Sequence, residues 1–489
     1  MAELIVSIDI GTSVIKAGAY TEVAGLVAME HQRTTSLPDG SVDAEAVWGT
    51  TCRAIRSLLD RPEMAGHRVA AVVVTGQGDG LWTITADGTA AGPAYQWNDA
   101  RADEVVAGWE ADGTIAAAYR LNDTVVWPGT SGALWVWLHE NSPDHVRRTR
   151  WVVCAPDWIN YRLTGEVATD VSNAGIPFLD PDSRTWSTEL IGILGCEDIA
   201  ARLPKVLLPG DSLGTVTQRA SRETGLAAGT PVVMGAIDVV AMFRGVGFED
   251  PGTVVAVLGT TAVALACVTG RADPTVQVGA TVPFPEPGRF LRVIGANSGT
   301  STLDWYVREV LGGPLDAAAL DRFWKEVGNV SAESAHVMLL PFLAGERAPF
   351  LAPDATGTFL GIKPTTKRAD LSYAVAEGIT MSLRHCVESA AGEPTAILLS
   401  GGGATSREWQ QMVADALGHE IMVDGHHDRA CAGAVSFVTG SLPGVPHDID
   451  RLKPARSEAI EERFAAYVAL TGLMQPIWRR LHFTTRRVP

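Results

Sequence analysis

Two short segments of glycine and hydroxyl residues lie about half a chain apart, and each follows a run of apolar residues. Gly11-Thr12-Ser13 closes the run that begins at Ile5, and Gly259-Thr260-Thr261 closes the run that begins at Val254. A glycine has no Cβ, so its backbone can approach an anion closely and offer N–H groups, while the hydroxyls add donors. The two segments together predict a pair of phosphate-binding turns, although one alone would also fit an ordinary hairpin turn.

Two carboxylates and one ammonium group are placed to act on such a phosphate. Asp9 ends the first strand pattern, where it could hold Mg²⁺ directly or through water, and Lys16 could add positive charge near the turn. Asp238 ends another apolar run, and ligands of open parallel sheets gather beyond the carboxyl ends of the strands. A carboxylate there can accept the proton of an attacking alcohol and share in the Mg²⁺ site. Helix caps and salt bridges are the commoner roles of such a residue.

Three consecutive glycines form a third candidate site. Gly401, Gly402 and Gly403 lie between an apolar run and a helical pattern that Ser406 would cap. Bare backbone of this kind would accept a flat group such as adenine, or a ribose, and a tight strand-to-helix turn is the alternative. The chain has no Gly-x-x-x-x-Gly-Lys-Ser/Thr segment, so a Walker-type P-loop is excluded as the nucleotide site.

A further turn with polar side chains follows the apolar run of residues 69–74. Gln77 and Asp79 could form hydrogen bonds with substrate hydroxyls, and Gly78 between them is expected to leave room for the substrate. The alternative is that Asp79 only orders the glycine turn, a role that aspartate often has.

A tryptophan and two charged residues make up the last candidate element, Trp97-Asn-Asp-Ala-Arg101. The ring of Trp97 could lie against the C–H side of a polyol, and Asp99 and Arg101 could bind its hydroxyls. Opposite charges at this short spacing also pair with each other to fix a loop, and the sequence leaves both alternatives open.

The elements that must position these residues alternate between strand and helix patterns, which predicts an α/β fold with parallel strands. A chain of 489 residues suits two large domains, and the repeated turn indicates two domains of one architecture facing each other. Strands are expected at Leu4–Ile10, Val69–Val74, Trp151–Cys154, Pro231–Ala236, Thr253–Leu258, Arg289–Ile294, His336–Leu340 and Thr395–Leu399. Helices are expected at Ala44–Leu59, Leu371–Ser389 and Ser406–Leu417.

Composition limits the partners. Lysine and arginine total 39 against 56 aspartates and glutamates, a formal charge of −17, which disfavours nucleic acid and anionic membranes as partners. No run approaches the ~20 apolar residues that span a bilayer, and the N-terminus has no leader pattern. The six cysteines are scattered without zinc-site spacing, as in proteins of a reducing compartment, so we expect the cytoplasm.

Several motifs, in order along the chain, resemble those of the FGGY family of carbohydrate kinases. They are Ile8–Ser13 with Lys16, Leu258–Thr261, Gly345–Pro349, Gly357–Ile362 followed after seven residues by Asp370–Glu377, and Gly401–Gly403 with Ser406 and Trp409. Two positions depart from the family pattern. Ala376 stands where a larger apolar residue is usual, and Leu134 stands where a second signature usually has lysine.

The resemblance implies a fold of two ribonuclease-H-like domains of the actin and sugar-kinase superfamily, with a cleft between them. Residues 1–245 would bind the sugar or polyol, and residues 246–489 would bind ATP through Gly259–Thr261 and Gly401–Gly403. Asp238 aligns with the family's catalytic base, and Asp9 aligns with the residue near Mg²⁺ and the transferring phosphate. The expected reaction is transfer of the γ-phosphoryl group of ATP to a substrate hydroxyl.

The substrate is a less specific inference. The segment Gly76–Gly80 resembles the erythritol-kinase branch, Ile237–Val240 is similar to the L-xylulose-kinase branch, and xylulose kinases carry Met-His where Gly78-Asp79 stand. A four- to five-carbon polyol or ketose is expected. The alternatives are a xylulokinase proper, a superfamily ATPase without a sugar acceptor, and a sugar sensor without catalysis. The phosphorylated hydroxyl, its stereochemistry and the choice between monomer and homodimer stay open.

Overall fold

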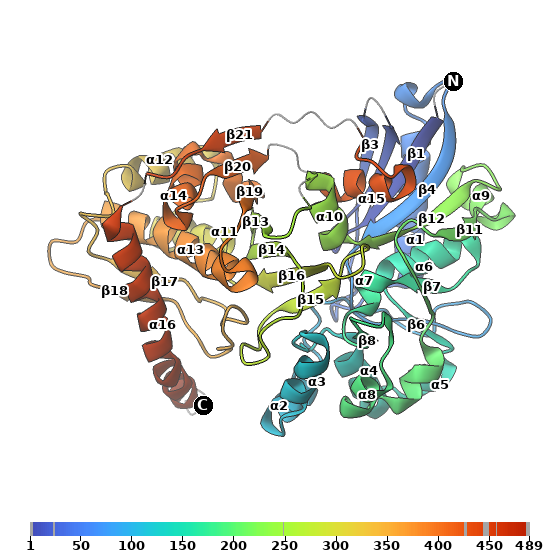
Figure 1. Cartoon of the computed structure of the whole chain (residues 1–489), viewed down its shortest axis with the longest axis horizontal. Helices are drawn as coiled ribbons and strands as arrows, with labels where there is room; N and C mark the ends of the chain where they lie inside the picture. The colour runs from blue at the N-terminus through green and yellow to red at the C-terminus, as the bar shows by residue number, and fades with distance from the viewer. Residues whose placement is uncertain are drawn as a thin grey trace. The chain divides into compact units, whose positions relative to one another are not determined.

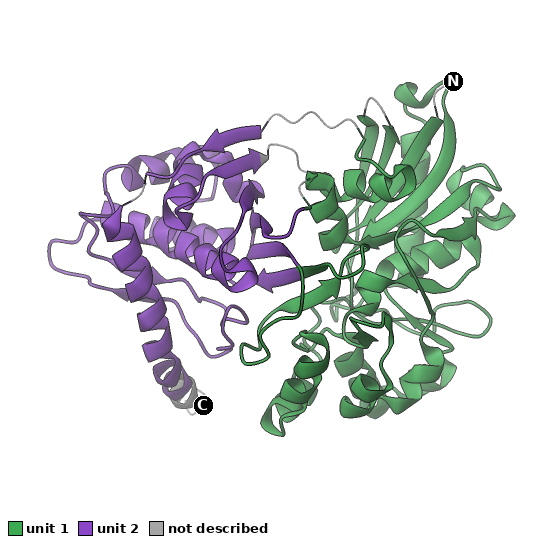
Figure 2. Cartoon of the chain, in the orientation of Figure 1, with its two compact units in different colours: residues 1–249, 269–291, 428–446 green, residues 250–268, 292–427, 447–489 purple. Residues whose placement is uncertain are grey.

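The computed structural model describes residues 3–22, 25–247, 249–424, 428–443, 449–455 and 457–485. The chain forms two compact units (Figure 2). Unit 1 comprises residues 1–249, 269–291 and 428–446, and unit 2 comprises residues 250–268, 292–427 and 447–489. The chain therefore first passes to unit 2 close to the predicted boundary at residue 245, and two later segments return to unit 1.

Unit 1 is built on a six-stranded sheet with the order β11-β12-β4-β1-β2-β3 (Figure 1). Strands β1, β2 and β3 are antiparallel neighbours, and β1, β4 and β12 are parallel. The strands are β1 (Glu3–Ile10), β2 (Val14–Thr21), β3 (Gly25–Arg33), β4 (Arg68–Gly76), β11 (Ser212–Thr215) and β12 (Pro231–Ile237). Because β1, β4 and β12 are parallel, their carboxyl ends, which carry Asp9, Gln77 and Asp238, lie at one edge of the sheet.

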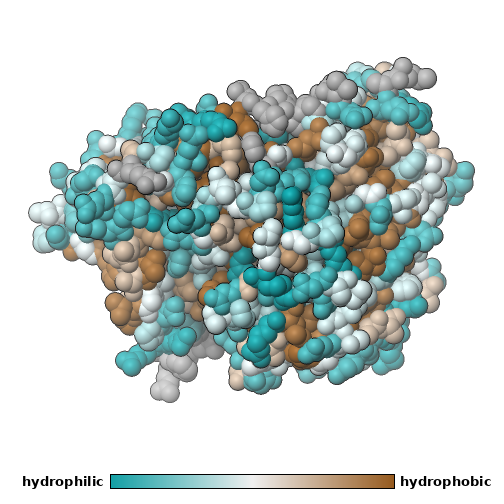
Figure 3. Space-filling model, viewed as in Figure 1, coloured by the Kyte–Doolittle hydropathy of each residue, from teal (hydrophilic) through white to brown (hydrophobic). Residues whose placement is uncertain are grey.

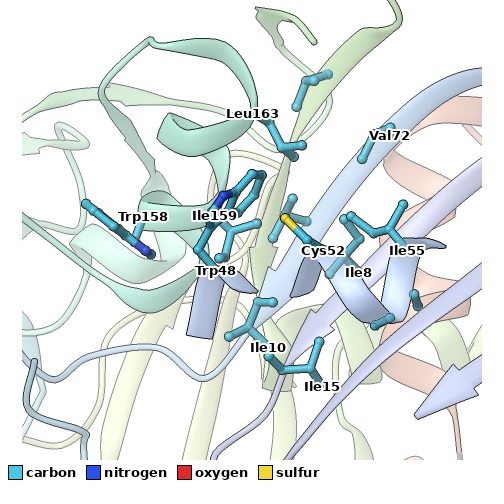
Figure 4. Close-up of a cluster of buried hydrophobic side chains, with 14 of the residues drawn as sticks. Ile8, Ile10, Ile15, Trp48, Cys52, Ile55, Val72, Trp158, Ile159 and Leu163 are labelled. Carbon is cyan, nitrogen blue, oxygen red and sulfur yellow. The ribbon is translucent and has the colours of Figure 1, made fainter. Parts of the chain in front are cut away.

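Helices cover both faces of this sheet, which is why its central strands read as continuous apolar runs. Ile8 and Ile10 of β1 pack with Trp48 and Ile55 of α1 (Ala44–Leu59), whereas Ile5 packs on the other face with α15 (Arg429–Thr439). The first of these cores also takes in residues of α6 (Ala155–Thr164), and Figure 4 shows it. The period of two along β1 divides its side chains between the two cores.

Unit 2 repeats the strand order of unit 1. Strand β13 has a hairpin partner, β14, on one side and a parallel strand, β19, on the other, and β20 follows β19 in parallel. The corresponding strands in unit 1 are β1, β2, β4 and β12. The sheet that contains β13 has seven strands, in the order β15 (Ala280–Pro283), β16 (Phe290–Gly295), β14 (Ala262–Val268), β13 (Thr253–Leu258), β19 (Ala396–Ser400), β20 (Ile421–Asp424) and β21 (Ile449–Leu452). The repeat confirms the predicted pair of domains with one architecture.

The helices agree with the predicted patterns where periodicity was strong. Helix α1 begins and ends at the predicted residues, and Asp43 caps its start by accepting hydrogen bonds from the N–H groups of Glu45 and Ala46. Helix α13 (Arg368–Ala391) contains the predicted helix Leu371–Ser389. Helix α14 (Arg407–Leu417) begins one residue after the predicted start, because Ser406 is its cap. Further long helices are α2 (Asp103–Ala111), α3 (Thr114–Asn122), α4 (Ser131–Asn141), α10 (Asp238–Val246), α12 (Ala317–Val327) and α16 (Glu458–Thr485).

The eight predicted strands are all present, with ends within two residues of the prediction. Outside the two large sheets they include β6 (Trp151–Val153) and β17 (Met338–Leu340). All six cysteines are buried and none forms a disulfide bond, as expected for thiols of the interior. Within the part of the chain that the structure describes, no helix combines the length and the hydrophobicity that crossing a membrane requires.

Candidate active site

The first predicted phosphate turn is the three-residue connection between β1 and β2. Its form requires glycine, because a Cβ on Gly11 would lie 2.6 Å from the carbonyl oxygen of Val14. Thr34 binds the carbonyl groups of the two residues that follow Gly11. Its N–H donates to Ser13 O at 3.0 Å and its hydroxyl donates to Thr12 O at 2.6 Å. With these acceptors occupied, the turn is left to present donors, as an anion-binding turn must.

The second predicted turn, Gly259–Thr261, occupies the same place between β13 and β14 in unit 2. Its carbonyls are engaged in the same way: Thr300 N donates to Gly259 O, and the Ser301 hydroxyl donates to Thr260 O, each at 2.8 Å. The two turns therefore share an architecture in which a neighbouring segment holds the carbonyl groups.

Asp9, Lys16 and Asp238 lie together at the edge of the unit 1 sheet. Asp9 and Lys16 are paired across β1 and β2, and Lys16 Nζ lies 3.7 Å from Asp9 Oδ2. Burial raises the pKa of Asp9 to about 6 despite the attraction of Lys16. Burial, with the nearby charge of Asp9, raises the pKa of Asp238 to about 7. A carboxylate with this pKa can take and release a proton near neutral pH.

The buried oxygen Oδ1 of Asp9 has no hydrogen-bond partner among the described residues. An unsatisfied carboxylate oxygen of this kind fits a cation, reached directly or through water. Across the described ranges, no group of three or more His, Cys, Asp or Glu side chains is arranged to hold a metal ion. A single carboxylate suits Mg²⁺, which keeps several waters and takes its other ligands from phosphates.

Asp428 belongs to this group, and the sequence reasoning missed it. It precedes α15, and its Oδ1 lies 2.9 Å from Lys16 Nζ, closer than Asp9 does. Lys16 is therefore held between two carboxylates. Asp428 is remote from Lys16 in sequence, and the only local signal was an acidic residue before a helix of small side chains.

Gln77, Thr12 and Trp97 form one hydrogen-bonded set. The hydroxyl of Thr12 donates to Gln77 Oε1 at 3.0 Å and accepts from Trp97 Nε1 at 3.2 Å. Gln77 follows β4, whose last residue, Gly76, pairs with Ile237 directly before Asp238. The fold thus brings the predicted substrate residue Gln77 and the predicted base to neighbouring strand ends.

Asp79 is buried, with 2% of its surface exposed, and has a positive φ of 60°. Its Oδ1 accepts a hydrogen bond from the N–H of Ser131 at 3.1 Å, so it fixes the start of α4 to the turn. Its Oδ2 has no partner among the described residues, and burial raises the pKa of the carboxyl group well above its usual range. Asp79 therefore orders the turn through Oδ1, and Oδ2 takes no part in that role.

At Gly78, the side of the backbone where a side chain would lie is occupied by other residues of the protein. A Cβ at this position would lie 2.0 Å from Ile237 Cδ1 and 2.7 Å from Asn173 Oδ1. The space that the missing side chain leaves is filled by the protein itself. Sequence reasoning could not find this, because Asn173 and Ile237 are far from Gly78 along the chain.

Asp99 and Arg101 pair with each other, which was one of the two alternatives. Arg101 Nε lies 2.7 Å from Asp99 Oδ1, and the guanidinium carbon lies 4.2 Å from the centre of the Tyr95 ring. The pair nevertheless borders a cavity of about 690 Å³ in unit 1. The cavity is lined by Thr12, Ser13, Thr34, Ser36, Asp39, Gly40, Gln96, Asn98, Asp99, Ala100 and Arg101.

The three consecutive glycines of unit 2 differ in their surroundings. A Cβ on Gly401 or Gly403 would lie 2.7 or 2.6 Å from atoms of Leu258, whereas a Cβ on Gly402 would meet nothing within 4 Å. Gly401 and Gly403 therefore allow close packing against the end of β13, and Gly402 alone leaves open space. Ser406 is used as a helix cap, accepting from Trp409 N at 3.3 Å.

Glu346 is a second residue that the sequence reasoning did not single out. Its Oε1 accepts from the N–H groups of Asn297 and Arg347, and its Oε2 accepts from the hydroxyl of Ser298. The segment after Ser298 supplies the donors that hold Gly259–Thr261, so Glu346 supports the second turn through that segment. The signal for it was the Gly345–Pro349 motif, to which no role had been given.

Two sheets of one strand order, each with a phosphate-type turn in its first hairpin, define a two-domain phosphotransferase of the sugar-kinase class. The FGGY N-terminal domain model matches residues 4–245, and the FGGY C-terminal domain model matches residues 254–438. The chain belongs to the FGGY family of carbohydrate kinases, which use ATP to phosphorylate sugar hydroxyls.

Relatives of known name match nearly the whole chain. An erythritol kinase of Brucella abortus is 27% identical over 98% of this chain and 98% of its own length. A xylulose kinase of Streptomyces rubiginosus is 32% identical over 90% of this chain and 88% of its own length. Among solved structures, a gluconate kinase from Lactobacillus acidophilus has the same fold, with a TM-score of 0.90 at 21% identity over 98% of this chain and 100% of that one.

Proposed function

We propose that this carbohydrate kinase phosphorylates a hydroxyl of a four- to five-carbon polyol or ketose, resembling erythritol or L-xylulose. The observation that carries the proposal is the placement of Asp238 beside Asp9, at the strand end next to the one that bears Gln77 and Asp79. These residues combine a proton acceptor with groups that bind hydroxyls. The similarity to an erythritol kinase supports a small polyol.

In the proposed reaction Asp238 accepts the proton of the substrate hydroxyl as its oxygen attacks the γ-phosphorus of ATP. The bond from that phosphorus to the bridging oxygen breaks, and ADP leaves. The donors of Gly11–Ser13 and Gly259–Thr261 stabilise negative charge on the phosphoryl oxygens. Lys16, held by Asp428, adds positive charge in unit 1, and Gly402 offers open backbone to the nucleoside.

Mg²⁺ is part of the proposal. Asp9 would hold the ion directly or through water by its unsatisfied oxygen, with Asp238 as a second carboxylate nearby. The ion would neutralise phosphate charge and orient the nucleotide. The residues of unit 1 would align the substrate hydroxyl and take up its proton.

The alternatives differ in what they require of the chain. A xylulokinase proper is a kinase of the same mechanism with another acceptor. A superfamily ATPase would not need Gln77, and a sugar sensor would not need Asp9 and Asp238 with raised pKa values. The intact acids favour catalysis, and the hydroxyl-binding residues favour an acceptor other than water.

The direct test is release of ADP from MgATP in the presence of single tetritols, pentitols, tetruloses and pentuloses. We expect strong stimulation by one small group of these acceptors, with product phosphorylated at one hydroxyl. Steady hydrolysis of ATP that no acceptor stimulates would contradict the proposal and favour the ATPase.

We also propose that the protein acts in the cytoplasm as a homodimer, without nucleic-acid or membrane partners. Six buried cysteines without a disulfide bond among them support a reducing compartment. For the dimer the supporting feature is α16, whose exposed side chains include Leu473 at 68% and Ile477 at 46%. Figure 3 shows hydrophobic side chains along this helix, at the lower left. Apolar side chains this exposed are common at protein interfaces.

The occupant that best fits α16 is a second copy of it. In an antiparallel pair centred on residue 471, Glu462 would face Arg480, Ala469 would face Leu473, and Ala465 would face Ile477. Large side chains would then meet small ones, and opposite charges would meet at both ends. Phe464, Tyr467 and Trp478, on the other side of the helix, are packed in the core of unit 2.

A further inference from the structure

The space beside Gly78 is closed by two side chains from different parts of unit 1. Ile237 is the residue before the proposed base, and its side chain fills the position where a Cβ of residue 78 would be. Asn173 closes the same space with its side-chain oxygen, at 2.7 Å from that position. Both residues are buried, so this wall belongs to the packed end of the sheet.

Asp170 holds Asn173 firmly in this place. The carboxylate of Asp170 accepts hydrogen bonds from the backbone N–H groups of Ser172 and Asn173 and from both of their side chains. The hydroxyl of Ser172 in turn accepts from the N–H of Ile237 at 3.1 Å. The segment 170–173 is therefore tied directly to the strand end that carries Asp238.

This arrangement leaves an acceptor without a donor. Asn173 Nδ2 is bound to Asp170, which fixes the orientation of the amide, and Asn173 Oδ1 is buried with no partner among the described residues. Oδ2 of Asp79, on the residue after Gly78, is in the same condition. Buried acceptors in native proteins are rarely left unsatisfied, so these two oxygens are suited to accept hydrogen bonds from a bound molecule.

A polyol or ketose would supply such donors. We propose that Ile237 and Asn173 determine acceptor specificity: Ile237 limits the size of the acceptor beside Gly78, and Asn173 Oδ1 accepts a hydrogen bond from one of its hydroxyls. The inference rests on the proposed function, because it assumes that the acceptor binds at the Gln77–Asp79 turn. It assigns the discriminating contacts to positions 173 and 237, which the Gln77–Asp79 motif itself does not contain.

The proposal also explains why residue 78 is a glycine. A side chain at position 78, such as the methionine of xylulose kinases, cannot coexist with Ile237 in its present place. Positions 78 and 237 are therefore coupled. A larger residue at 78 requires a smaller or displaced residue at 237, and the shape of the acceptor pocket changes with the pair.

The size limit is tested with Ile237→Ala, with Ile55→Ala in α1 as the control for loss of a buried isoleucine. We expect Ile237→Ala to raise the ratio of kcat/KM for an acceptor one carbon longer to that for the preferred acceptor by about tenfold or more, the usual effect of space for one methylene group. KM for ATP should not change in Ile237→Ala, and the ratio of the two kcat/KM values should not change in Ile55→Ala. An unchanged ratio in an active, folded Ile237→Ala protein would overturn this part.

The hydrogen bond is tested by a thermodynamic cycle that combines two changes: Asn173→Ala in the protein and the removal of one hydroxyl from the acceptor. For one deoxy acceptor, the loss of kcat/KM seen with the wild-type protein should largely disappear in Asn173→Ala, because both changes remove the same contact. Ser172→Ala, which disturbs the same segment without touching the acceptor, should keep the full loss. Additive losses for every deoxy acceptor would overturn the role of Asn173.

The outcomes separate the two proposals. Wild-type protein that no acceptor stimulates would overturn both of them. Wild-type protein with normal acceptor dependence, but with variants that lose activity equally on all acceptors, would overturn only the inference on Ile237 and Asn173. Thermal unfolding of each variant shows whether a loss reflects the fold.

Discussion

At the scale of single residues, the site depends on carboxylates whose environments differ. Asp9 and Asp238 have raised pKa values because the sheet edge and the helices around it bury them, and Lys16 offsets part of that effect. Arg101, in contrast, neutralises Asp99 within the same unit. Aspartate thus anchors a loop at position 99, and it is the proposed proton acceptor at position 238 and the proposed cation ligand at position 9.

Replacing Asp238 by asparagine removes the proton acceptor and keeps the size of the side chain. We expect turnover to fall by about 10²-fold or more, the usual range for loss of a positioned base, with little change in the affinity for ATP. Steady-state kinetics and nucleotide titration measure the two effects. Asp211→Asn, on the surface of unit 1, is the matched control. Turnover near the wild-type level would remove Asp238 from the role.

The pKa of Asp238 sets the direction of two pH effects. Only the ionised form can accept a proton, so kcat/KM should rise with pH and level off above about 7. Between the ordinary pKa of aspartate, about 4, and 7, the folded state keeps a proton that the unfolded state has lost, so this group makes folding less favourable as pH rises. Asp238→Asn should therefore gain thermal stability relative to wild type between pH 5 and pH 8. A constant difference across that range would contradict the raised pKa.

At the scale of elements, the two hairpin turns and the β19–α14 connection are the proposed binding elements for the phosphate and nucleotide groups. Each turn depends on a neighbouring segment, Thr34 in unit 1 and Thr300–Ser301 in unit 2, to hold its carbonyl oxygens. In the connection, Gly401 has a φ of 98° and lies against Leu258, so it is needed for the backbone itself. Gly402 is the member of the set that is free to face a ligand.

The two glycines should therefore respond differently to alanine. Gly401→Ala places a Cβ in a left-handed conformation and against Leu258, and we expect a loss of ~1–3 kcal/mol or more in the free energy of unfolding. Gly402→Ala should unfold like wild type and raise KM for ATP, because its Cβ would occupy open space that the nucleotide needs. Equal effects of the two substitutions on stability would refute this division of roles.

At the scale of the whole molecule, the chain is a pair of similar units that share segments in sequence. The proposed acceptor site, with Gln77, Ile237 and Asp238, is built by unit 1, and the proposed nucleotide turns around Gly259 and Gly402 are built by unit 2. Each unit carries its own hydrophobic core, which keeps its part of the site in place. In the proposed dimer, two such chains would associate through α16.

The dimer is tested by exchanging the charges that would meet across α16. Glu462→Arg alone should weaken the dimer, because it would face Arg480 of the second copy, and Glu462→Arg with Arg480→Glu should restore it. Leu473→Glu should give monomers, whereas Ile362→Glu, at another exposed apolar position, should not. Light scattering after size exclusion measures the mass. A wild-type protein that is monomeric at all accessible concentrations would rule the dimer out.

The sequence by itself determined the local elements and the class of enzyme. Ala44–Leu59 forms a helix and Thr253–Leu258 forms a strand at the predicted residues, because the period of their apolar residues and the cap at Asp43 are properties of near neighbours. The two glycine-hydroxyl turns and the repeated strand order could also be predicted, since hairpin chemistry is local and the repeat is visible in the chain.

Only the tertiary structure decided which side chains meet. Lys16 bonds to Asp428 from the far end of the chain, Gly78 is covered by Ile237 and Asn173, and Leu258 accounts for two of the three glycines. These contacts depend on strand order, register and helix packing, which bring together residues that are between 95 and 412 positions apart. Contacts of this kind cannot be predicted from a pattern of neighbouring residues. The sequence therefore indicated the chemistry of the site, and only the fold determined which side chains surround it.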